Sequence, residues 1–145
     1  MEHTAVHRRC PRAGLDPIVD ARSALAALAL AIERPRRAET IMILLDEARR
    51  GRTIVVVSGT DDADAVIEVV ECITRGEGCE ELGGVIVCSV RPNSDETDDE
   101  ADDDVDRWLE MSEIASLAGV ELVEWFVVGR AISCPRDRLG EPPRW

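Results

Sequence analysis

Residues 84–90 read GVIVCSV, a short run that is apolar almost without a break. Such a run is typical of a strand that is buried on both faces of a sheet. Further strands are predicted before it, over residues 40–45 and 52–58, and after it, over residues 120–128 and 131–134. The run at 84–90 therefore predicts a sheet of which it is a central strand.

Three helices are predicted around these strands from apolar residues at helical spacing. The first spans residues 18–32, the second runs from about residue 60 to residue 76, and the third spans residues 104–118. The first is interpreted as a helix and not as an export signal, because Asp16 and Asp20 precede its apolar part. The order α-β-β-α-β-α-β-β predicts an α/β fold, with a layered α/β sandwich and a mixed sheet.

The chain has 145 residues, which is enough for one domain with a core of its own. Residues 1–15 are predicted to be a flexible N-terminal segment, and residues 16–145 are predicted to form a single α/β domain. Two irregular parts are expected within that domain. They are an acidic loop at residues 93–103 and a C-terminal tail at residues 135–145, which contains three prolines.

Acidic side chains outnumber basic ones by 30 to 17, for a formal net charge of −13, and every basic residue is an arginine. This charge repels nucleic acid and anionic membranes, so neither is expected as a partner. The absence of lysine is typical of a GC-rich bacterial genome. Five cysteines without a Cys-x-x-Cys pair suit a reducing cytoplasm, and Cys72 and Cys88, which fall in apolar patterns, are expected to be buried and inert.

The sequence lacks the side chains on which most catalytic mechanisms depend. The two histidines are His3 and His7, and from residue 8 onward there is no His, Lys or Tyr. A Ser–His or Cys–His pair, a Schiff base and a phosphate-binding lysine are therefore excluded from the folded part. Nine of the twelve residues at 95–106 are acidic, which suits a hard cation such as Mg²⁺ or Ca²⁺, but a run of like charge is more typical of a solvated loop.

Four landmarks follow one another over residues 39–134: LLD at residues 44–46, VSGT at residues 57–60, VIVCSVRP at residues 85–92 and, after Gly119, LVEWFVVG at residues 122–129. In this order and spacing they resemble the RadC-type JAB/MPN domain family. The resemblance implies the α/β fold of that family. Active members bind zinc with a His-x-His-Pro motif and a downstream aspartate, beside a glutamate that acts as general base.

Set against that motif, the chain has a degenerate metal site. Ser89 and Arg91 fall on the two histidine positions, Asp104 falls on the aspartate, and Glu39 falls near the glutamate. A guanidinium has no lone pair and repels a cation, and one carboxylate does not hold zinc, so no catalytic residue, metal or other cofactor is expected. In place of the metal, Arg91 and Asp104 are predicted to form a charge-assisted pair, of the kind that is often bidentate. The alternative is that Arg91 points into solvent.

The sequence is therefore interpreted as a catalytically inactive JAB-like domain that serves as a protein-interaction or scaffold module. The protein partner and the oligomeric state stay open. Trp108, Trp125 and Trp145 are candidate anchors for a partner, although a terminal Trp145 can also fold back onto its own domain. The rival interpretation is an enzyme, a metal-dependent hydrolase that uses Glu39, Asp104 and the loop acids around Mg²⁺ or Mn²⁺.

Overall fold

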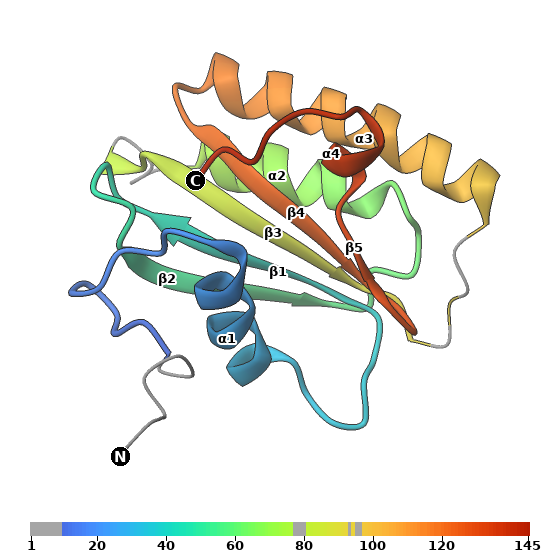
Figure 1. The fold of residues 1–145 in the computed structure, drawn as a ribbon, viewed down its shortest axis with the longest axis horizontal. Coiled ribbons are helices and arrows are strands. Elements are labelled where there is room, and N and C mark those ends of the chain that lie inside the picture. Colours follow the sequence, from blue (N-terminus) through green and yellow to red (C-terminus); the bar gives the residue numbers. More distant parts are fainter. Residues whose placement is uncertain (1–9, 77–80, 93, 95–96) are drawn as a thin grey trace.

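The computed structural model describes residues 10–76, 81–92, 94 and 97–145, and it shows a five-stranded sheet with helices on both faces (Figure 1). The sheet order is β2-β1-β3-β4-β5, and only β3 and β4 run parallel. The elements are α1 Ala21–Ala31, β1 Glu39–Leu45, β2 Gly51–Ser58, α2 Ala65–Arg75, β3 Gly84–Val90, α3 Asp98–Leu117, β4 Glu121–Val128, β5 Ile132–Ser133 and α4 Pro135–Arg138. The predicted α/β class and mixed sheet are confirmed. Helix α4 has no counterpart in the predicted order.

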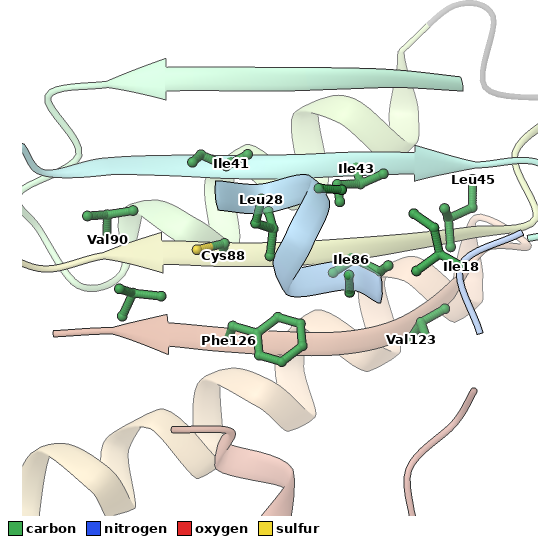
Figure 2. Packing of buried hydrophobic residues seen from close by; sticks show 13 residues of the cluster. Ile18, Leu28, Ile41, Ile43, Leu45, Ile86, Cys88, Val90, Val123 and Phe126 are labelled. Carbon is green, nitrogen blue, oxygen red and sulfur yellow. The ribbon is translucent and has the colours of Figure 1, made fainter. Parts of the chain in front are cut away.

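Side-chain alternation along the central strands divides the core into two clusters. Ile41, Ile86 and Phe126 belong to the cluster that packs against Leu28 of α1, which Figure 2 shows. The alternate residues of the same strands pack against α2 and α3 on the other face. Since both faces of β3 are covered, all seven of its residues are buried, as the apolar run at 84–90 predicts.

Helix α3 begins at Asp98, six residues before the predicted start, so the predicted acidic loop at 93–103 is wrong over its second half. Thr97 caps the helix, because its Oγ1 accepts a hydrogen bond from the Glu100 backbone N–H at 3.2 Å. Three acids, Asp98, Asp99 and Glu100, occupy the first turn. Negative charge is favourable there because the helix dipole is positive at this end. Residues 93, 95 and 96 lie outside the described residues.

The chain just before α1 contacts the sheet within the segment 1–15 that the sequence predicts to be flexible. The backbone N–H of Gly14 donates to the Gly51 carbonyl at 2.8 Å, and Arg12 pairs with Asp16. Helix α1 itself begins only at Ala21, where Asp20 and Ser23 form a capping box. The remainder of the predicted segment, residues 1–9, lies outside the described residues.

The structure corrects two further predictions, for the C-terminal tail and for Cys72. The predicted irregular tail at 135–145 starts with the short helix α4, which has Pro135 in its first turn. Cys88 is buried as expected, but Cys72 is exposed, because α2 turns Val66, Val70 and Thr74 inward and Cys72 lies on another side of the helix. None of the described helices combines the length and apolar character needed to cross a membrane.

Candidate functional site

The candidate site lies where β3 ends, between the sheet and the N-terminal half of α3. Ser89 is the second-last residue of β3, and Thr40 of β1 is its cross-strand partner. Arg91 follows directly after the strand, where its backbone N–H donates to the Val128 carbonyl at 2.8 Å and so holds the chain against the end of β4. This anchored backbone aims the Arg91 side chain at α3.

Asp104 reaches the site from the buried face of α3. It shares that face with Ala101, Trp108, Met111 and Ala115, at helical spacing, and its side chain is fully buried. Both of its oxygens accept hydrogen bonds from Arg91, with Nη1 to Oδ2 at 2.8 Å and Nη2 to Oδ1 at 2.9 Å. The predicted pair between Arg91 and Asp104 is confirmed and is bidentate. The alternative, in which Arg91 points into solvent, is wrong.

A second arginine, Arg107, also binds the Asp104 carboxylate. Arg107 lies one turn after Asp104 on α3 and donates from Nη1 to Asp104 Oδ1 at 2.7 Å, while its Nε donates to Asp64 Oδ1 at 2.8 Å. Partial burial acts to lower the pKa of Arg107, but its bonds to Asp64 and Asp104 outweigh that effect and raise the pKa. The Asp104 carboxylate therefore accepts three N–H donors from two guanidinium groups, and its charge is fully compensated.

Ser89 and Trp125 close the sheet side of the site. The indole N–H of Trp125 donates to Ser89 Oγ at 3.0 Å, and the Arg91 guanidinium carbon lies 5.9 Å from the centre of the Trp125 ring. The ring is fully buried. Trp125 is therefore a wall of this site and not an exposed anchor for a partner, which corrects the expectation from the sequence.

A hollow of about 230 Å³ opens beside Arg91. Its polar wall includes Thr40 and Thr60, whose hydroxyl groups are 3.0 Å apart, together with Asp61, Asp62 and Glu100. Arg91 Nη1 also lies 3.4 Å from Glu100 Oε1. The polar side chains among the described residues that line the hollow are hydroxyls, carboxylates and the paired Arg91, with no His, Lys or Cys.

Glu39 forms no hydrogen bond with the other residues of the site in the described part of the structure, and its placement near the family's glutamate stays a prediction. Glu39 borders the hollow, but its carboxylate is buried without a hydrogen-bond partner among the described residues. The pKa of the Cys88 thiol is raised to about 12, first by burial and then by the charge of Glu39. Cys88 belongs to the α1-side core, so the Glu39 carboxylate acts on the face of the sheet opposite to Ser89. Alternation along β1 gives the position beside Ser89 to Thr40.

The acids of α3 do not converge on a cation. Asp102, Asp103 and Asp106 are exposed around the helix, while Asp104 alone of this run turns into the core. Within residues 10–76, 81–92, 94 and 97–145, no group of three or more His, Cys, Asp or Glu is arranged to hold a metal ion. The ligand set that the hydrolase interpretation needs is not assembled in this part of the chain.

The two other tryptophans also pack onto the domain. Trp108 is fully buried on α3, with the Arg144 guanidinium 4.5 Å from its ring centre, so its expected role as an exposed anchor is wrong. Arg144 further donates from Nη1 to the Leu122 carbonyl at 3.0 Å, and Trp145 packs against the α1-side core. For Trp145 the alternative of a tail that folds back is confirmed.

A second buried ion pair escaped the sequence analysis. Arg136 of α4 donates from Nε to Glu124 Oε2 at 2.9 Å, and the two side chains are 8% and 2% exposed. Burial acts to lower the pKa of Arg136, but the bond to Glu124 raises it by more. The pKa of Cys134 is raised to about 12 by burial and then by Glu124. One signal was present: Glu124 is the single acid within the apolar residues 122–128, and a buried acid needs a basic partner.

Neither a protein-family model nor a curated protein matches this chain, so the likeness to the RadC-type JAB/MPN domain depends only on the landmarks within residues 39–134.

Proposed function

We propose that this chain is a catalytically inactive domain of the RadC-type JAB/MPN kind, and that it serves as a protein-interaction or scaffold module. The observation that carries the proposal is the bidentate pair between Arg91 and Asp104. The resemblance implies zinc at this point, held by two imidazoles and a carboxylate. Here Arg91 stands at the position of one imidazole, and its guanidinium donates hydrogen bonds to both oxygens of Asp104, which stands at the position of the carboxylate ligand.

The residues present do not fit zinc. Both Asp104 oxygens already accept N–H donors from Arg91, Oδ1 accepts a further one from Arg107, and Ser89 Oγ accepts one from Trp125. A cation would have to displace two permanently charged guanidinium groups, which repel it. Metal-assisted hydrolysis therefore has no support at this site.

Nucleophilic catalysis also lacks support near the core. The thiol pKa is raised to about 12 for both Cys88 and Cys134, so neither forms a thiolate at neutral pH. The arrangement of the site instead stabilises the fold, because Arg91 connects the end of β3 to α3. A fold that is stabilised where an enzyme would bind its metal is suited to contact other proteins, and the analogy with inactive relatives supports this class.

Elemental analysis of the purified protein tests the proposal. We expect no stoichiometric zinc and no change of melting temperature in EDTA, because the guanidinium groups compensate the buried Asp104 carboxylate. One equivalent of zinc that survives purification and whose removal lowers the melting temperature would contradict the proposal. The same samples incubated with Mg²⁺ or Mn²⁺ test the rival hydrolase, which requires a stabilising shift with one of these ions.

A gain-of-metal variant tests the alignment behind the proposal. The variant Ser89→His with Arg91→His restores both imidazoles and releases one cation from Asp104, so we expect it to bind zinc. Ser89→His alone is the matched control and should not, because Arg91 still occupies the carboxylate. A double variant that folds but takes up no zinc would place the family's metal site elsewhere.

A further inference from the structure

Strand β2 leaves one edge of the sheet open. The opposite edge is covered, because β5 pairs with the end of β4 and the Arg144 side chain donates to the Leu122 carbonyl near its start. On the β2 side, the segment before α1 covers only the beginning of the strand, with Ile18 N–H donating to the Arg49 carbonyl at 2.8 Å and Pro17 bridging to Arg50. Among the described residues, no strand lies beside the outer edge of residues 52–58.

This open stretch is unusually apolar for an edge. It reads RTIVVVS, and Ile54 and Val56 are 44% and 43% exposed. Both face the α1 side, since their cross-strand partners are Ile43 and Ile41 of the α1-side core. Edge strands are usually protected by charges, bulges or a covering segment. Here Arg52, the register shift at Leu44/Leu45 and the covering segment all lie at the beginning of the strand, and none protects residues 53–58.

An apolar hollow extends the open edge onto the helix. It has a volume of about 310 Å³ and lies between α1, β2 and residues 10–13. Ile54 and Thr53 form its strand side, and Leu30, which is 77% exposed, forms part of its helix side. An added strand at β2 would therefore continue both the hydrogen-bonded sheet and its apolar surface.

We propose that this edge pairs with β2 of a second copy of the chain, antiparallel and about a twofold axis at Val55. In this register Ile54 lies opposite Val56 of the other copy, Thr53 opposite Val57, and Arg52 opposite Ser58. Residues 53–57 are all β-branched, so the twofold axis pairs β-branched side chains at every inner position. Such side chains are favourable cross-strand neighbours. The two Arg52 side chains lie at opposite ends and do not face each other. Self-complementarity of this kind is what a twofold interface requires.

The distribution of charge also favours a second copy of the chain at this edge. Residues 1–60 contain ten arginines and seven acids, while residues 61–145 contain seven arginines and 23 acids. Residues 48–60 have no acid at all, so two copies of a strongly acidic protein meet where neither is acidic. The acidic helix α3 packs against β4, which lies three strands away from β2 in the sheet. Joining the β2 edges therefore puts the two α3 helices at the far ends of the combined sheet. A catalytic domain could carry the same edge, so the dimer is independent of the proposed function.

Sedimentation equilibrium over a micromolar concentration series tests the dimer. We expect wild type to reach the dimer mass. Ile54→Glu and Val56→Arg should each remain monomeric, because a charge then faces an apolar residue of the other copy. Ile132→Glu is the matched control at the opposite edge, where Ile132 is 52% exposed, and it should dimerise like wild type. Circular dichroism of each variant establishes that it is folded.

Mixing the two charged variants tests the register. In a mixed dimer the glutamate introduced in one copy would face the arginine introduced in the other, while the second pair keeps its native Val56 and Ile54. A heterodimer is therefore expected where each variant alone is monomeric. A monomeric wild type would overturn the proposal and leave the edge to a strand of another protein. A wild-type dimer that survives Ile54→Glu would overturn it as well, since another surface would then form the dimer. A folded mixture that stays monomeric would overturn the register.

Discussion

Two buried carboxylates of the described structure, Asp104 and Glu124, accept hydrogen bonds from different numbers of arginines. Asp104 accepts two hydrogen bonds from Arg91 and a third from Arg107. Glu124 accepts one from Arg136 and one from the backbone N–H of Trp125, so a single arginine compensates its charge. If Arg91 is removed, Arg107 still compensates the Asp104 charge, whereas the removal of Arg136 leaves Glu124 without an arginine. How much a pair stabilises a fold therefore depends on what remains when one partner is removed.

The difference follows from where each carboxylate lies. Asp104 is on a helix, so Arg107 at the next turn can reach Oδ1 of the same carboxylate. Glu124 is on β4 at a point where the pairing with β3 shifts register between Val85 and Ile86. Such a bulge turns two successive side chains to the same face. Glu124 thus enters the side of the core that holds Val123 and Phe126, where its basic partner comes from α4.

The largest effect is expected for Arg136→Met. This change leaves the Glu124 charge buried without a cation, so we expect a loss of about 3 to 5 kcal/mol in the free energy of unfolding, measured by urea denaturation. Arg138→Met, in the same short helix, is the control. Its pair with Asp102 is exposed, at 45% and 69%, and should contribute about 1 kcal/mol or less. Equal losses for the two variants would contradict the assignment of Arg136 as the arginine that compensates the Glu124 charge.

Arg91→Met should cost less, about 3 kcal/mol at most, because Arg107 still compensates Asp104. A double-mutant cycle with Asp104→Asn measures the coupling, and the double variant should lose less than the sum of the single losses. If Arg107 acts as the reserve cation, then adding Arg107→Met to Arg91→Met should cost more than it does in wild type. Strictly additive losses would mean that the three side chains do not act as one unit.

A smaller effect is expected at the start of α3, which positions Asp104. Thr97→Ala removes the cap of the first turn and should lower the free energy of unfolding by about 1 kcal/mol. Ser116→Ala, exposed in the last turn of the same helix, is the control and should change it by less than about 0.5 kcal/mol. Thermal denaturation followed by circular dichroism measures both. A neutral Thr97→Ala would mean that the acids alone set the start of the helix.

The smallest effect concerns the reactivity of the cysteine thiols. The pKa of Cys134, beside Glu124, is raised to about 12, so its reactive thiolate is scarce until the pH approaches that value. We expect iodoacetamide to label the exposed Cys72 of the folded protein at mildly alkaline pH, while Cys88 and Cys134 are labelled far more slowly. Mass spectrometry of peptides measures the rates, with the urea-unfolded protein as control. Rapid labelling of Cys134 would mean that the Glu124 region opens readily.

Local patterns were sufficient for most of the regular elements. The run at 84–90 predicts β3 to the residue, because burial on both faces leaves no position for a polar side chain other than Ser89. The start of α3 could not be found in the same way. There the acids of residues 98–103 are typical of a solvated loop, and only the Thr97 cap and the packing of the later turns make them helical.

The sequence by itself determined the α/β class, the central strand and the scarcity of catalytic side chains. These depend on residue type and spacing, which a sequence contains. Only the tertiary structure decided that Trp108 and Trp125 are buried, that Glu39 acts on the face away from Asp104, and that Arg136 compensates Glu124. Each of these depends on which side of a strand or helix faces a neighbour, and that neighbour comes from elsewhere in the chain. Residue type alone does not specify the neighbour, because the same side chain is stable in water or in the core according to what packs against it.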